Sequence, residues 1–377
     1  MIRNDYKIFS VLLLILFICS YDVAAQKKKG VFKDTLDNAF DISNYMYNLH
    51  GFLPIISPIT EPAVGYGGVL AGVFFIPKKD ADTSRFQMPD IAGIAGGLTE
   101  NGTWFMGAGY IGFWKQDRIR YRGVVGYGDI NLKYYGSGDG FLSENPIKFN
   151  LSSYFFLQQA IFRIGNSKFF LGGRYMFSKT KITAFQDAEY ISPHDFDLTN
   201  SGVGFISEYE KLNILLSPTK GWRVNLSYDQ YLQALGGDRD FGKLSFFTLY
   251  YQPILKNWTA GFRVESLLSV GDAPFYTLPF ISLRGVPAMR YQGEITALIE
   301  TEQQVMITKR WGIVAFGGYG QTFNYSNDLK KDSKAWNAGA GFRYLIARRL
   351  GLKMGIDVAR GPEQWAIYVV FGSAWIR

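Results

Sequence analysis

One pattern recurs along most of the chain and limits the folds open to it. From about residue 64 to the C-terminus, segments of about 10 to 15 residues alternate apolar and polar side chains, and turn-forming residues separate them. One example runs over residues 222–229, where Trp222, Val224, Leu226 and Tyr228 alternate with Arg223, Asn225, Ser227 and Asp229. This alternation is typical of long β-strands with one apolar and one polar face.

The aromatic residues indicate which face meets which environment. Aromatic residues make up 17% of the chain and charged residues 19%, with 42 glycines. Charged residues recur in the middle of the polar faces, whereas tryptophans cluster at strand ends: Trp114, Trp222, Trp258, Trp311, Trp336, Trp365 and Trp375. A soluble sandwich has shorter strands and turns its apolar face inward. The pattern instead predicts an all-β transmembrane barrel with aromatic girdles and a polar lumen, located in a Gram-negative outer membrane.

The number of strands follows from counting and parity. Fifteen segments have the pattern, at about 64–76, 90–99, 102–115, 118–128, 147–164, 167–180, 201–214, 220–233, 242–254, 257–271, 293–308, 311–323, 335–347, 350–360 and 364–377. A bacterial barrel of this class has an even number of strands. Gly51 to Thr60 is the best candidate for the missing one, because a strand at the seam tolerates Pro54 and Pro58. We therefore predict a 16-stranded antiparallel barrel over residues 51–377, with fourteen strands as the alternative.

The N-terminus has the order of parts of a secretory signal. Arg3 and Lys7 precede an apolar run from Ile8 to Ile18, and Val23-Ala24-Ala25 offers a cleavage site, so residues 1–25 are predicted to be a signal peptide. The only cysteine, Cys19, would leave with it. A lipoprotein signal that uses Cys19 is the alternative, disfavoured because Ile18 is bulky. The mature chain then has no thiol for a disulfide or a metal site.

Residues 26–50 form a separate segment before the barrel. Lys33 to Leu49 has an apolar stripe with helical spacing, ended by Gly51, and predicts one short amphipathic periplasmic helix. The helix would lie on the rim, plug the barrel or contact a partner.

The connections between strands alternate in length. Short turns, such as 165–167 and 217–221, are expected in the periplasm, and longer loops outside. The longest loop, about 272–292, is apolar and contains three prolines, so we expect it to fold back into the barrel.

Four motifs, in this order along the chain, resemble those of the BamA/TamA superfamily of outer-membrane assembly and translocation barrels. They are Asn131–Gly138, the turn Asn213–Arg223, the loop Ile281–Pro287 with Arg284-Gly285, and the closing stretch from Gly355–Gly361 to Phe371–Trp375. The resemblance implies that the arginine loop lies in the lumen between strands eleven and twelve of sixteen. It also implies that Arg284 pairs with Glu302. Glu300 and Asp357 have inward-facing positions on their strands and are further candidate acceptors. The alternative is that these carboxylates only line a water-filled interior. Trp375 resembles the aromatic residue that ends such barrels and serves as their assembly signal.

The chain departs from the family in two places. Gly318 stands where the family often has an aspartate, so part of the arginine's usual cradle is expected to be missing. The roughly 35 residues before the barrel are too few for one POTRA domain, since a soluble domain needs about 50. The resemblance therefore implies a barrel-only member.

Function is predicted at the level of class. We expect a non-enzymatic protein of outer-membrane protein or lipid assembly or translocation, whose partners are the lipid bilayer and other outer-membrane or periplasmic assembly proteins. A passive channel is the alternative. The sequence has two histidines, His50 and His194; the second stands beside Ser192, Asp195 and Asp197, and a mobile loop is a poor frame for a triad or metal site. No cofactor or metal is expected. The net charge of +8 forms no basic stripe, which argues against nucleic acid.

Overall fold

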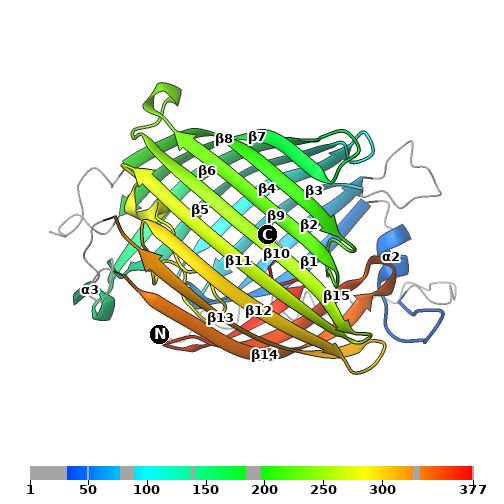
Figure 1. Ribbon diagram of the computed structural model, residues 1–377. Helices are drawn as coiled ribbons and strands as arrows, with labels where there is room; N and C mark the ends of the chain where they lie inside the picture. Colours follow the sequence, from blue (N-terminus) through cyan, green and yellow to red (C-terminus); the bar gives the residue numbers. More distant parts are fainter. Residues whose placement is uncertain are drawn as a thin grey trace, which may run out of the picture.

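The chain folds into a single antiparallel β-barrel (Figure 1). The computed structural model describes residues 32–48, 51–76, 89–136, 141–183, 197–325 and 332–375. Each strand pairs with the next along the chain, and β1 and β16 lie next to each other without a strand ladder between them among the described residues. The barrel is therefore nearly closed, with a seam between its first and last strands.

The sixteen strands are β1 (Gly51–Glu61), β2 (Gly65–Ile76), β3 (Asp90–Thr99), β4 (Trp104–Trp114), β5 (Ile119–Tyr134), β6 (Ile147–Arg163), β7 (Phe169–Thr183), β8 (Asp197–Leu212), β9 (Gly221–Tyr231), β10 (Phe241–Leu255), β11 (Trp258–Gly271), β12 (Ile295–Met306), β13 (Trp311–Phe323), β14 (Lys334–Ala347), β15 (Leu352–Arg360) and β16 (Trp365–Phe371). The predicted class and strand number are confirmed. Gly51–Glu61 is the strand that the parity argument required. It has a ladder on one side only, which allows its two prolines.

The two ends of the barrel differ. One end, here called the short-turn end, carries the turns 115–118, 164–168, 213–220, 256–257, 307–310 and 348–351. The opposite end, the long-loop end, carries the short turns 62–64, 100–103 and 361–364 and several longer connections, including α3 (Phe141–Glu144), η2 (Gln233–Leu235) and the connection 272–294. Since the chain enters β1 at the short-turn end, we expect this end to face the periplasm.

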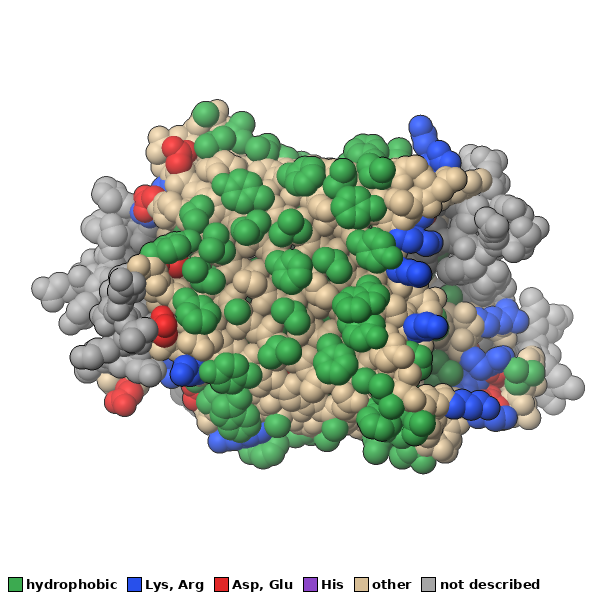
Figure 2. Space-filling model, viewed as in Figure 1, with side chains coloured by type: hydrophobic (Ala, Val, Ile, Leu, Met, Phe, Trp, Pro, Cys, Tyr) green, Lys and Arg blue, Asp and Glu red, His purple; other side chains and the backbone are tan. Residues whose placement is uncertain are grey.

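The outer surface matches a bilayer in its chemistry. Figure 2 shows apolar side chains over the middle of the barrel wall and charged side chains toward its two ends. Exposed tryptophans form a row near each end: Trp114, Trp222 and Trp311 at the short-turn end, and Trp104, Trp336 and Trp365 at the long-loop end. These rows are the aromatic girdles expected of an outer-membrane barrel. Among the described helices, none is long and apolar enough to cross a bilayer, and this finding does not bear on crossing by strands.

Trp375 does not belong to a girdle. The prediction that β16 continues to the C-terminus is wrong, because the strand ends at Phe371. Gly372 follows with a left-handed φ of 77°, and the amide of Ser373 donates to the carbonyl of Leu216 at 2.8 Å. The chain thereby turns into the barrel, where Trp375 is 1% exposed.

The predicted helix over Lys33 to Leu49 is also wrong. Helix α2 spans only Ser43–Asn48, and Lys33 instead forms a β-bridge with Phe40. The reason is local competition for the backbone: carboxylates of Asp34, Asp37 and Asp41 accept hydrogen bonds from the amides two residues further on, at 3.0, 3.1 and 2.6 Å. Such bonds favour turns over helix. Leu49, His50, the predicted signal at 1–25 and residues 192–195 lie outside the described residues.

Candidate functional site: a lumen closed by an arginine loop

The connection between β11 and β12 folds into the barrel, as its composition predicted. Its apolar side chains are buried, among them Ile281 at 1% and Leu283 at 4% exposed. Phe275, in η3 (Phe275–Thr277), packs on Phe149 of β6, while Leu283 belongs to a cluster with Leu298 of β12. The loop thus contacts the inner wall on two sides of the lumen.

Arg284 is the centre of the loop's polar contacts. Its guanidinium donates to Glu302 at 2.9 Å, to Asp357 at 2.7 Å and to Glu300 at 3.1 Å. It also stacks over the ring of Phe316, 3.4 Å from the ring centroid. The structure therefore brings together around this arginine all three carboxylates that the sequence analysis named.

Glu300 connects this arginine to the rest of the interior. Besides Arg284, it accepts hydrogen bonds from Asn337 at 3.1 Å and from the indole of Trp375 at 2.6 Å, and it pairs with Arg263 at 3.2 Å. A carboxylate that is 1% exposed needs such partners to offset its desolvation. Trp375 thus joins the end of the chain to the loop site, a role that the sequence did not predict.

Asp357 completes the charge balance. It accepts from Arg343 of β14 as well as from Arg284, and it is fully buried. The guanidiniums of Arg263, Arg284 and Arg343 therefore share the carboxylates of Glu300, Glu302 and Asp357, and Arg263 also lies 4.0 Å from Glu265. An acceptor was expected to be missing at Gly318, but Asp357 supplies the third carboxylate to Arg284. Asn337 occupies the space beside Gly318, since the Oδ1 atom of Asn337 would lie 2.8 Å from a Cβ added to Gly318.

Gly285 is required by geometry. Its φ of +85° is in the left-handed region, and an added Cβ would lie 2.8 Å from the backbone nitrogen of Gly361. The amide of Gly285 also donates to the hydroxyl of Tyr368 on β16, at 2.8 Å. The Arg284-Gly285 pair therefore fixes the loop between β12 and the last two strands, beside the seam.

A second segment crosses the barrel at the short-turn end. The turn 213–220 between β8 and β9 reaches across to the other side of the barrel, where the hydroxyl of Ser217 accepts from the amide of Lys353 on β15 at 3.1 Å. The carbonyl of Leu216 accepts from the amide of Ser373. The proline-glycine turn and the arginine loop thus meet the same group of C-terminal strands.

A second arginine cluster lies outside the lumen, at the short-turn end, and here is called the rim cluster. Arg310, in the turn between β12 and β13, donates to Asp37 at 2.7 Å and to Asp41 at 2.5 Å, and it also contacts Asp34. Arg348, in η5 (Arg348–Leu350), bonds Asp34 at 2.9 Å. These contacts attach the segment 32–48 to the barrel.

The rim carboxylates are strongly perturbed. Hydrogen bonding to Arg348 holds the pKa of Asp34 well below its ordinary value, and hydrogen bonding to Arg310 lowers the pKa of Asp37. Burial opposes ionisation of Asp41, but hydrogen bonds from Ser43 and Arg310 outweigh it and lower its pKa. All three carboxylates are therefore bound as anions. Sequence reasoning missed this cluster, although the spacing of Asp34, Asp37 and Asp41 places them on one side of the segment.

Comparisons with known proteins agree with this architecture. Residues 114–281 match the Omp85 superfamily domain. BamA from Haemophilus ducreyi lacking POTRA domains 1–3 is similar in structure, with a TM-score of 0.59 at 12% identity over 86% of this chain and 70% of that chain. CdiB from Escherichia coli has a TM-score of 0.58 at 12% identity, over 84% of this chain and 61% of its own. CdiB from Acinetobacter baumannii has a TM-score of 0.56 at 10% identity, over 85% of this chain and 59% of its own.

The chain thus spans less than two thirds of the length of either CdiB protein. A comparison with curated proteins finds no match. At these identities the structural likeness concerns the fold.

Proposed function

We propose that this outer-membrane barrel, which carries an Omp85 superfamily domain, acts in the assembly or translocation of outer-membrane proteins or lipids and does not serve as a standing pore. The observation that carries the proposal is the position of the arginine loop inside the lumen. The arginine loop crosses it and is attached by Arg284 to three carboxylates on β12 and β15.

The position of the attachment supports the same function. Arg284 and Gly285 contact β12, β15 and β16, so the loop rests against the strands that border the seam. β16 has only seven residues, and no ladder joins it to β1 among the described residues. A short last strand exposes the unpaired edge of β1, and such an edge is suited to receive a strand of a client protein.

A passive channel is the competing function. Charged side chains on the inner wall, such as Arg174 paired with Asp229, would then set ion selectivity. That function requires an open path past the loop and the turn 213–220.

The test is reconstitution of the full chain into liposomes. We expect the liposomes to accelerate the folding of an added, urea-unfolded eight-stranded outer-membrane barrel, measured as the heat-modifiable band on gels, and to remain impermeable to small sugars. Protein-free liposomes are the control. Rapid sugar permeation without any effect on folding would show that the protein acts as a channel and not in assembly.

A further inference from the structure

The inner wall of the barrel is divided into an apolar and a charged part. The side chains that β2, β3 and β4 turn inward are apolar or absent, for example Val73, Ile91 and Ile111. Across the cavity, Arg120 on β5 and Glu210 on β8 belong to a charged wall. A cavity of about 870 Å³ lies between the two parts, within the range of roughly 300 to 1,000 Å³ that holds small molecules.

The apolar wall selects for a particular kind of occupant. The backbone amides and carbonyls of β2, β3 and β4 are used in their ladders, so this wall offers no donors or acceptors to a ligand. A peptide or a sugar would leave its own polar groups unsatisfied there, whereas an acyl chain has none. Gly93 and Gly109 are paired in register on the neighbouring strands β3 and β4, so no side chain projects into the cavity from the centre of this wall.

One end of the cavity holds an arginine that makes no ion pair among the described residues. On the charged wall, Arg120 pairs with Glu210 at 3.0 Å and Arg223 pairs with Glu208 at 3.1 Å. Arg122 lines the same cavity but has no carboxylate within ion-pairing distance among the described residues. An unpaired guanidinium on a partly buried wall favours an anion.

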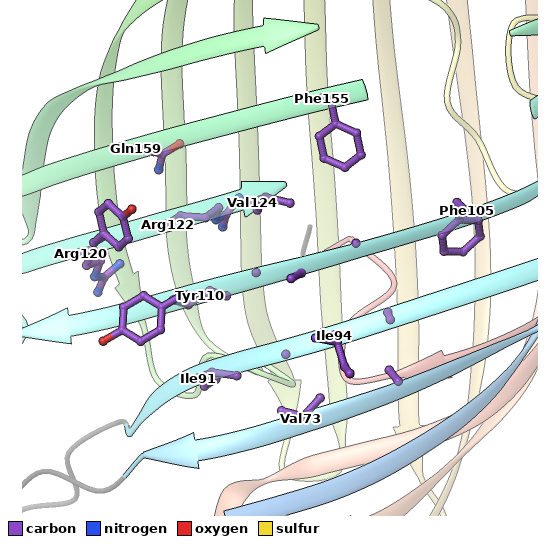
Figure 3. A pocket seen from close by; sticks show the side chains of 18 of the residues that line it. Val73, Ile91, Ile94, Phe105, Tyr110, Arg120, Arg122, Val124, Phe155 and Gln159 are labelled. Atoms are coloured by element: carbon purple, nitrogen blue, oxygen red, sulfur yellow. The ribbon is translucent and has the colours of Figure 1, made fainter. Parts of the chain in front are cut away.

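The charged and the aromatic side chains lie at opposite ends of the cavity. In Figure 3, Arg120, Arg122 and Gln159 lie toward one end, and Phe105 and Phe155 lie toward the other. The charged end is the short-turn end, since β5 begins at Ile119. The cavity therefore has a cationic end and an apolar body.

We propose that the lumen cavity binds an anionic amphiphile, with its acyl chain against β2–β4 and its negative head group at Arg122. A fatty acid carboxylate and the phosphate of an anionic phospholipid share this chemistry. The site goes beyond the proposed function and does not depend on it, because neither the arginine loop nor the seam contributes to its anion end.

The test is photo-crosslinking of the purified full chain in detergent. The probes are palmitate and phosphatidylglycerol that carry a diazirine on the acyl chain, with the matching uncharged hexadecanol probe for comparison. Peptide mass spectrometry then locates the label, and heat-modifiability confirms that each variant is folded. Labelling by palmitate alone identifies a fatty acid site, and labelling by phosphatidylglycerol identifies a phospholipid site.

Two variants test the two halves of the site. Arg122→Gln should lower labelling of the inward residues by an anionic probe about tenfold and leave hexadecanol labelling unchanged, as expected for a lost charge-assisted contact. Arg118→Gln, an exposed arginine in the neighbouring turn, is the matched control.

Gly93→Leu should abolish inward labelling by all probes. The nearest atom to the new Cβ would lie 3.4 Å away, so the backbone can keep its place, but the leucine side chain would fill the cavity. Gly96→Leu, on the outer face of the same strand and with the same room for a Cβ, is its control.

The proposal is overturned if the label appears only on outward residues such as Leu70 and Leu98, which do not line the cavity. It is also overturned if the anionic probes and hexadecanol respond equally to Arg122→Gln, because the head group would then have no contact with this arginine.

Discussion

Two arginine clusters are built alike but lie in different surroundings. In the lumen, Arg284 contacts Glu300, Glu302 and Asp357, and at the rim, Arg310 contacts Asp34, Asp37 and Asp41. Each cluster attaches a chain segment to the barrel through three carboxylates. The lumen carboxylates are 0 to 11% exposed. At the rim, Asp34 and Asp41 are also only 4% exposed, but Asp37 is 24% and the neighbouring Arg348 is 40% exposed, and the cluster lies at the end of the barrel and not inside it.

This difference predicts different responses to the same change. A buried charge without its partner keeps most of its desolvation penalty, so removing one member of a buried cluster costs several kcal/mol. At a partly exposed cluster, water and salt replace the lost partner, and the cost falls toward that of a surface pair. The lumen cluster should therefore control the barrel, and the rim cluster only the segment attached to it.

The largest effect is expected for Arg284→Ala. It leaves three carboxylates with two guanidiniums and should destabilise the protein by about 3 to 5 kcal/mol, the range for a broken buried pair. The measurement is denaturant unfolding in detergent, with protease resistance of residues 272–292 as a local readout. Arg239→Ala removes a surface pair with Asp272, whose side chain is 73% exposed, and should change stability by less than about 1 kcal/mol.

A double-mutant cycle sharpens this result. Arg284→Ala and Glu302→Gln should be non-additive, because the first substitution already removes the partner of the second. Strict additivity would show that the two side chains do not interact, and the loop would then be held by its apolar packing alone.

A smaller and more local effect is expected for Arg310→Ala. It should make residues 32–48 accessible to protease while the unfolding midpoint of the barrel stays unchanged, because the strands do not depend on this segment. Lys309→Ala, an exposed neighbour in the same turn, is the control. A large fall in the midpoint with Arg310→Ala would show that the rim cluster also stabilises the barrel.

Acid should weaken the attachment of residues 32–48 at the rim cluster. The pKa values of Asp34, Asp37 and Asp41 are lowered in the folded protein, so their contribution is fully present above the ordinary value of 3.8 and is lost as the pH falls below it. We expect pepsin to cleave within residues 32–48 faster at pH 2 than at pH 4. The Arg310→Ala variant, in which the segment is already released, corrects for the pH dependence of pepsin itself. If the cleavage rate relative to this variant is the same at pH 2 and pH 4, the attachment is not ionic.

The smallest effect on the barrel should follow deletion of residues 26–49. The deleted protein should keep the heat-modifiability of the full chain on gels. Loss of a co-purifying protein from pull-downs after this deletion would identify the segment as a docking element and not a simple rim element.

The same contrast explains what sequence reasoning achieved. Alternation predicts which residues face inward, so Glu300 and Glu302 could be placed in the lumen, and the loop motif indicated Arg284 as their partner. The rim cluster joins Asp37 to Arg310, which lies 273 residues away, and no local pattern reports such a contact. The apolar stripe of this segment suggested a helix, although the carboxylates of its three aspartates bond their own backbone.

Two other features depend on single positions that a periodic pattern does not reveal. Trp375 continues the alternation of β16, but the left-handed conformation of Gly372 turns the chain inward before it. Asp357 was expected as an additional acceptor, yet only the register of β14 and β15 shows that it also takes Arg343 and thus replaces the acceptor missing at Gly318.

The central claim is that Arg284 keeps the loop in place and the lumen closed, and single-channel conductance in a planar bilayer tests it most directly. The full chain should show little steady current. Deletion of residues 272–292 should give a large stable pore, and Arg284→Ala should give frequent openings, with Arg239→Ala as silent as the unaltered protein. A steady large pore in the unaltered protein, unchanged by either alteration of the loop, would contradict the account.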